Sequence, residues 1–133
     1  MSRRERLPRS VRLISGLVAG VAIAGVDNYA FGGEVSPIVI VALLFLVLAG
    51  MGALWGKAGI PPAVIVWVCV PVSHAAKHAL GLPDSLHPNT YLSILELAGF
   101  TLAVSCVGAL LGLLLNRVRN GGDGTNVHPS SAR

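Results

Sequence analysis

Two histidines four residues apart, His74 and His78, have the spacing in this sequence that most clearly predicts chemistry. Residues at i and i+4 share one face of an α-helix, and this spacing lets two imidazoles reach one metal ion. Asp27 and Glu96 could add carboxylate oxygens. Two histidines with one or two carboxylates suit zinc or another divalent transition metal. The sequence therefore predicts a metal or small-ligand site formed by His74, His78, Asp27 and Glu96.

Three further polar residues could support this site through hydrogen bonds or charge: Asn28, Lys77 and Ser93. A plainer interpretation is structural, with Lys77 neutralising a partly buried Asp27 or Glu96. A third is proton handling, because ionisable residues inside a membrane span are functional candidates by default. The sequence does not identify a cofactor, and a divalent metal such as zinc is one candidate.

The loop that follows His78 adds Asp84, His87 and Asn89 to the polar residues near this site. Because the loop is rich in proline, we expect Asp84 and His87 to be solvated. These residues are therefore secondary to the two histidines in the sequence interpretation.

Four long apolar stretches must position these residues, in a chain of 133 residues that is 53% hydrophobic and 12% charged. An average soluble domain has about 25% charged residues, so the composition indicates a lipid environment. Each stretch is close to the roughly 20 residues that a helix needs to cross the hydrocarbon core. We predict an all-α integral membrane four-helix bundle with spans at about 12–30, 37–55, 61–80 and 91–116.

The distribution of basic residues predicts the orientation of this bundle. If the N-terminus is cytoplasmic, nine of the ten Lys and Arg residues lie on that side and Lys77 lies on the other. This is a strong positive-inside bias. We therefore predict a multi-pass protein of a bacterial inner membrane with both termini cytoplasmic, where 1–11 is a basic N-terminus and 117–133 a disordered tail. The candidate site residues then share a shallow outer layer.

An alternative concerns the N-terminus, where Arg3 and Arg4 precede an apolar run as in a twin-arginine export signal. Cleavage of such a signal would leave three spans and place Asp27 at the mature N-terminus. The apolar run at 13–26 is long for a signal, which favours an uncleaved first span.

Small residues at four-residue spacing predict close helix contacts, either within the bundle or at a homodimer face. The pairs are Gly16 with Gly20, Gly52 with Gly56, and Gly108 with Gly112. The last pair continues a small and polar face that includes Thr101 and Ser105. The lipid bilayer is the predicted partner. Nucleic acid is not, because the basic residues flank the spans and lack a folded polar surface to display them.

The functional hypotheses follow from these features. The first is a membrane protein that binds a divalent metal or a small polar ligand at its outer face. The alternative is a structural or assembly subunit of a larger membrane complex. A weaker one is a small transporter with Asp27 and Glu96 as ion-coupling carboxylates. An enzyme is the least favoured class, because no nucleophile or acid–base pair stands out beyond the same cluster.

Overall fold

The computed structural model describes residues 7–29, 37–84 and 90–121. The elements are α1 (Arg9–Tyr29), α2 (Pro37–Trp55), the short 3-10 helix η3 (Gly56–Gly59), α3 (Ile60–Ala79) and α4 (Tyr91–Gly121). These described ranges contain no β-strand, which confirms the all-α class. Most of the predicted tail and residues 1–6 of the predicted basic N-terminus lie outside the described residues.

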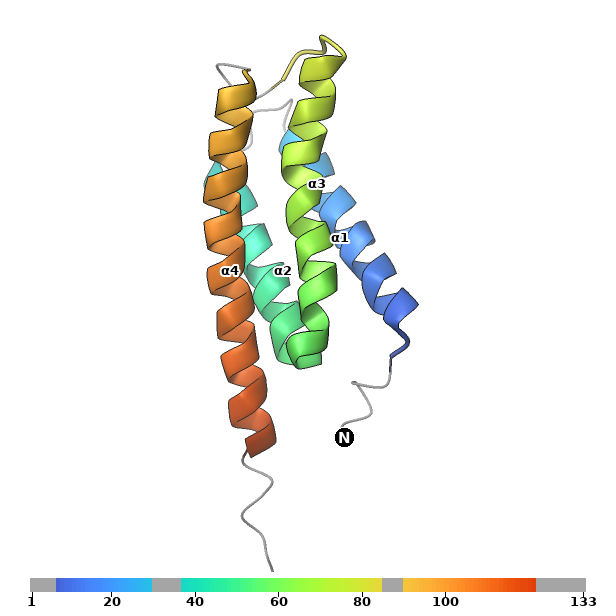
Figure 1. The fold of residues 1–133 in the computed structure, drawn as a ribbon, viewed down its shortest axis with the longest axis vertical. Coiled ribbons are helices and arrows are strands. Elements are labelled where there is room, and N and C mark those ends of the chain that lie inside the picture. The colour runs from blue at the N-terminus through green and yellow to red at the C-terminus, as the bar shows by residue number, and fades with distance from the viewer. Residues whose placement is uncertain (1–6, 30–36, 85–89, 122–133) are drawn as a thin grey trace, which may run out of the picture.

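Three stretches of the described chain are long and apolar enough to cross a membrane: Arg9–Asn28, Ile38–Ala79 and Tyr91–Gly121. The second has 42 residues and covers α2 from Ile38 onward, η3 and α3, and α2 and α3 form an antiparallel hairpin (Figure 1). Large apolar side chains are exposed on all four α-helices, among them Val18, Leu46, Val72 and Leu110. These features indicate a membrane-embedded protein, since lipid solvates such side chains.

Successive α-helices run in opposite directions (Figure 1). The ends of α1 and α3 therefore lie near the beginnings of α2 and α4, and we call this side of the molecule the Asp84 end. The opposite side, where α2 meets α3 through η3, is called the Lys57 end. Helix α4 continues to Gly121, beyond the limit near residue 116 that hydropathy suggested, and extends past the other helices at the Lys57 end (Figure 1).

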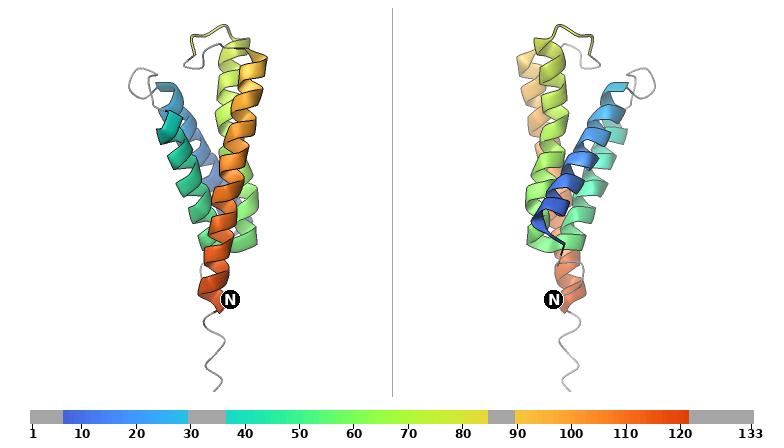
Figure 2. Two further views of the ribbon diagram at one scale, coloured as in Figure 1. Left: turned by 90° about the vertical axis from the view of Figure 1, so that its left-hand side faces the viewer. Right: turned by 90° about the vertical axis from the view of Figure 1, so that its right-hand side faces the viewer.

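The helices associate mainly as two pairs, α1 with α3 and α2 with α4 (Figure 2). Glycine makes the first crossing close: a Cβ atom on Gly16 would lie 2.7 Å from the carbonyl oxygen of Pro62. A Cβ atom on Gly20 would lie 2.7 Å from the Sγ atom of Cys69. The predicted small-residue contact of α1 is therefore made within the chain.

Glycines also bring α2 and α4 together in the half of the bundle towards the Lys57 end. A Cβ atom on Gly52 would lie 2.8 Å from the carbonyl oxygen of Ala109, and one on Gly112 would clash with that of Ala49. Gly56 begins η3 with a positive φ of 55° because α2 ends at Trp55, and a Cβ atom on it would lie 3.1 Å from Oδ1 of Asn116 on α4.

The predicted small and polar face of α4 is buried in the bundle. Thr101 and Ser105 are 1% and 4% exposed, and Gly108 and Gly112 are buried on the same face. The indole Nε1 of Trp67 on α3 lies 3.2 Å from both the Thr101 hydroxyl and the Ala98 carbonyl oxygen of α4. This contact joins the two helix pairs below the polar residues of the Asp84 end.

Candidate functional site

The C-terminus of α3 determines where the following segment lies. The amide of Leu82 donates to the carbonyl of Lys77 at 3.0 Å, and the amide of Gly81 donates to that of His78 at 3.2 Å. Gly81 has a φ of 64°, which glycine adopts without a Cβ penalty. This pattern is the Schellman motif, which ends a helix and reverses the chain. Asp84, three residues later, returns to the helix end.

The imidazole of His74 lies between two carboxylates that come from different segments. Its Nε2 atom is 2.7 Å from Oδ2 of Asp27 on α1. Its Nδ1 atom is 2.9 and 2.8 Å from Oδ1 and Oδ2 of Asp84. The cluster is enclosed: the side chains of His74, Asp84 and Asp27 are 3%, 0% and 15% exposed. We call these three residues the Asp27–His74–Asp84 cluster.

The distances in the cluster restrict where its protons can lie. An ionised carboxylate can only accept hydrogen bonds, so each ring nitrogen of His74 must carry a hydrogen to satisfy its partner. If both aspartates are ionised, His74 must be an imidazolium. The Nζ atom of Lys77 lies 3.8 Å from Oδ1 of Asp84, so two positive and two negative charges balance. Pairing of this kind offsets part of the desolvation cost of buried charges.

A neutral hydrogen-bond pair lies beside the charged cluster. The Nδ2 atom of Asn28 donates to the Ala24 carbonyl at 2.7 Å and to the Ser73 hydroxyl at 3.0 Å. The Ser73 hydroxyl donates its own hydrogen to the Val70 carbonyl at 2.7 Å, which fixes the orientation of the amide. The buried Oδ1 atom of Asn28 consequently has no hydrogen-bond partner among the described residues. Asn28 thus supports the α1–α3 contact, and its predicted role as a hydrogen-bonding neighbour of a ligand site stays a prediction.

The remaining predicted site residues lie elsewhere. The ring of His78 packs nearly perpendicular to that of Tyr91 on α4, with ring centroids 4.3 Å apart. Glu96 is exposed on α4, without a hydrogen bond or ion pair within the described ranges. The Ser93 amide donates to the Thr90 hydroxyl oxygen at 3.2 Å, so Thr90 caps the start of α4, and the two hydroxyl oxygens lie 2.9 Å apart. Among the four predicted ligands His74, His78, Asp27 and Glu96, the described contacts bring together His74 and Asp27.

The described residues contain no group of three or more His, Cys, Asp and Glu side chains placed to hold a metal ion. Metal binding therefore stays a prediction. The prediction that Asp84 is solvated is wrong, because its side chain is completely buried. The signal that could have found it is Gly81, since a glycine just past a helix end predicts a chain reversal over the last turn. His87 lies outside the described residues.

Comparisons of the chain with models of known protein families, with curated proteins and with solved structures find no match. The geometry of the cluster is therefore the basis of the functional proposal.

The nitrogen–oxygen distances in the cluster fit a shared hydrogen better than a shared zinc ion. Two ligand atoms that bind one tetrahedral zinc ion at about 2.0–2.1 Å lie about 3.3 Å apart. The three described nitrogen–oxygen distances at His74 are 2.7 to 2.9 Å, which are hydrogen-bond distances. A zinc ion between His74 and either aspartate would need that carboxylate to move back by about 0.5 Å and the intervening proton to leave.

Proposed function

We propose that this protein binds a small cation at its outer face, and that the resident cation is the proton on His74. The observation that supports this proposal is the buried imidazole with a carboxylate on each ring nitrogen. A divalent metal ion such as zinc would be a competitor for the same donors. In this proposal Asp27 and Asp84 hold the cation, and Lys77 balances the charge.

The helix contact between α1 and α3 does not require ionisable side chains, so their presence in the cluster supports a binding function. Asn28 and Ser73 already link α1 to α3 through neutral hydrogen bonds at the same depth. Buried ion pairs can often be replaced by apolar residues without loss of stability. Ionisable side chains in membrane spans are therefore functional candidates, and here they converge from α1, α3 and the segment after α3.

We propose binding in preference to transport because the next layers of the bundle are mostly apolar and contain no buried charged side chain among the described residues. Val70 and Val66 lie one and two turns from His74 along α3 towards the Lys57 end, and both are fully buried. Leu44 and Leu48 of α2 belong to the same hydrophobic core. The hydroxyls of Thr101 and Ser105 are buried at this level, but the buried residues described between His74 and the Lys57 end include no charged side chain that could pass a cation on.

The proposed topology has four spans in a bacterial inner membrane, with the Asp84 end outside and both termini in the cytoplasm. Arg9 and Arg12 of α1, Lys57 of η3, and Arg117 and Arg119 of α4 belong to segments at the Lys57 end. This distribution supports the proposal because cytoplasmic flanks are enriched in Lys and Arg.

The proton can be tested directly by NMR spectroscopy of the detergent-purified protein with ¹⁵N-labelled histidine. A His74→Gln variant assigns the signal. We expect both ring nitrogens of His74 to carry hydrogen at neutral pH, and His78 serves as the internal comparison. A neutral His74 with one unprotonated nitrogen would contradict the proposal.

The competing metal is tested by calorimetric titration of the same protein with zinc. Binding that releases a proton, and that is lost in His74→Gln but kept in His78→Gln, would identify zinc as the cation. Zinc binding that survives in His74→Gln would place any metal site elsewhere.

A further inference from the structure

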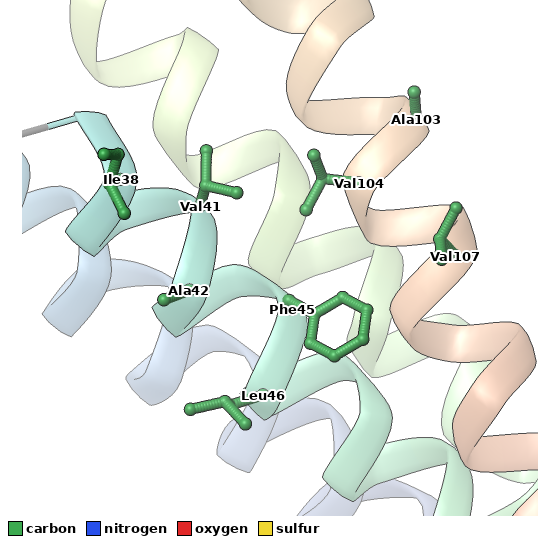
Figure 3. Close-up of a pocket in the computed structure, with 8 residues that line it drawn as sticks. All are labelled: Ile38, Val41, Ala42, Phe45, Leu46, Ala103, Val104 and Val107. Atoms are coloured by element: carbon green, nitrogen blue, oxygen red, sulfur yellow. The ribbon is translucent and has the colours of Figure 1, made fainter.

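An apolar groove lies between α2 and α4 on the surface of the bundle (Figure 3). Its walls include Ile38, Ala42 and Phe45 on α2, and Ala103, Val104 and Val107 on α4. The groove has a volume of about 570 Å³, which is within the range of roughly 300–1,000 Å³ that is typical of ligand pockets. Its lining side chains are all apolar, so it suits a hydrocarbon chain.

The groove extends through only one half of the membrane-spanning region. Its α2 wall runs from Ile38 to Leu46, or about 12 Å at 1.5 Å per residue. Towards the Lys57 end, glycines close the gap: a Cβ atom on Gly108 would lie 2.8 Å from the Phe45 carbonyl oxygen. The hydrocarbon core is about 30 Å thick. An occupant that enters from the Asp84 end therefore belongs to one leaflet, whereas a partner's transmembrane helix would have to continue past this closure.

A carboxylate lies on the same helix face as the α4 wall of the groove. Glu96 precedes Ala103 by seven residues and Val107 by eleven, spacings that place the three on one face of α4. Glu96 is exposed and lies nearer the Asp84 end than either of them. Between them, Gly99 has open space where its Cβ would be. This arrangement joins an apolar groove to a negative charge in the surface layer of the membrane.

We propose that the groove binds a hydrocarbon chain of an aminophospholipid from the leaflet at the Asp84 end, with the ammonium head group paired to Glu96. Charge complementarity supports this occupant, because a carboxylate near the hydrocarbon region is stabilised by a cation. A symmetric second copy docked through the same face would bring two Glu96 side chains together, which like charges disfavour. This proposal is independent of the proton on His74.

The test is native mass spectrometry of the full chain in detergent with phosphatidylethanolamine or phosphatidylglycerol of identical acyl chains. We expect retention of one phosphatidylethanolamine at about fivefold higher affinity than phosphatidylglycerol, as one exposed ion pair can provide. Glu96→Gln should make the two affinities equal. Equal affinities in the unaltered protein would overturn the pairing with Glu96.

Two variants test the groove itself. Ala103→Trp and Ala42→Trp fill it from opposite walls, so each should abolish lipid retention, while Val18→Trp on the exposed face of α1 should not. Circular dichroism identifies any variant that fails to fold, and the other groove variant then gives the result. Retention equal to that of Val18→Trp would overturn the proposal, as would a dimer that Ala103→Trp converts to monomer.

Discussion

Nε2 of His74 lies 2.7 Å from Oδ2 of Asp27, a residue 47 positions earlier in the chain. This hydrogen bond joins the ends of α1 and α3, and the other ring nitrogen is bonded to Asp84 at the same time. His74 is therefore the centre of the cluster, since its removal would leave both carboxyl groups without their shared hydrogen-bond partner.

Replacing His74 by leucine should destabilise the protein by about 3 kcal/mol or more, because it leaves buried carboxylates incompletely paired. Reversible unfolding in mixed micelles with increasing SDS measures the change in the free energy of unfolding. His78→Leu is the matched control, on the same helix and one turn away. It loses a ring contact with Tyr91 that is worth about 0.5–1.5 kcal/mol. Equal losses in both variants would contradict a special role of His74.

The two aspartates should not contribute equally to stability. Both Asp84 oxygens lie within 2.9 Å of His74, and the side chain is 0% exposed. Asp27 uses one oxygen and is 15% exposed, so water can partly compensate for its loss. We expect Asp84→Asn to lower the free energy of unfolding more than Asp27→Asn, by about 1 kcal/mol or more. The same SDS titration measures both, and the reverse order would contradict this account.

Sequence periodicity could predict the helices but not the partners of their faces. Hydropathy alone indicates the all-helical class and the membrane stretches, because apolar length is a local property. His74 and His78 share a face by spacing, yet His74 contacts α1 and His78 contacts α4. Which neighbour each meets depends on how α3 is rotated between two helices, and spacing within one helix carries no information about that rotation.

Asp84 shows a second limit of sequence reasoning. Its position depends on the left-handed conformation of Gly81, which reverses the chain at the end of α3. A polar residue in a proline-rich loop is solvated by default, so the burial of Asp84 follows from tertiary structure and not from its residue type. By contrast, spacing alone places Thr101, Ser105, Gly108 and Gly112 on one face, and the structure shows that this face is buried within the bundle.

The close crossing of α2 and α4 predicts opposite tolerance to alanine at two glycines of α4. A Cβ atom on Gly112 would clash with the carbonyl of Ala49, while one on Gly99 meets nothing within 4 Å. We expect Gly112→Ala to destabilise the protein by about 1–3 kcal/mol, because the helices must move apart. Gly99→Ala should change the free energy of unfolding by less than about 0.5 kcal/mol. Tolerance of alanine at Gly112 would show that the two helices do not pack this closely.

The proposed topology predicts which connections face the outside of the cell. In a variant without cysteines, made by Cys69→Ala and Cys106→Ala, a single cysteine is introduced at Lys57 or at Pro83. Both positions are exposed, and they lie at opposite ends of the bundle. A membrane-impermeant maleimide added to intact cells should label Pro83→Cys and not Lys57→Cys, and permeabilisation should expose Lys57→Cys. The reverse pattern would place the Asp27–His74–Asp84 cluster on the cytoplasmic side, where its cation would equilibrate with the cytoplasm and not with the outside of the cell.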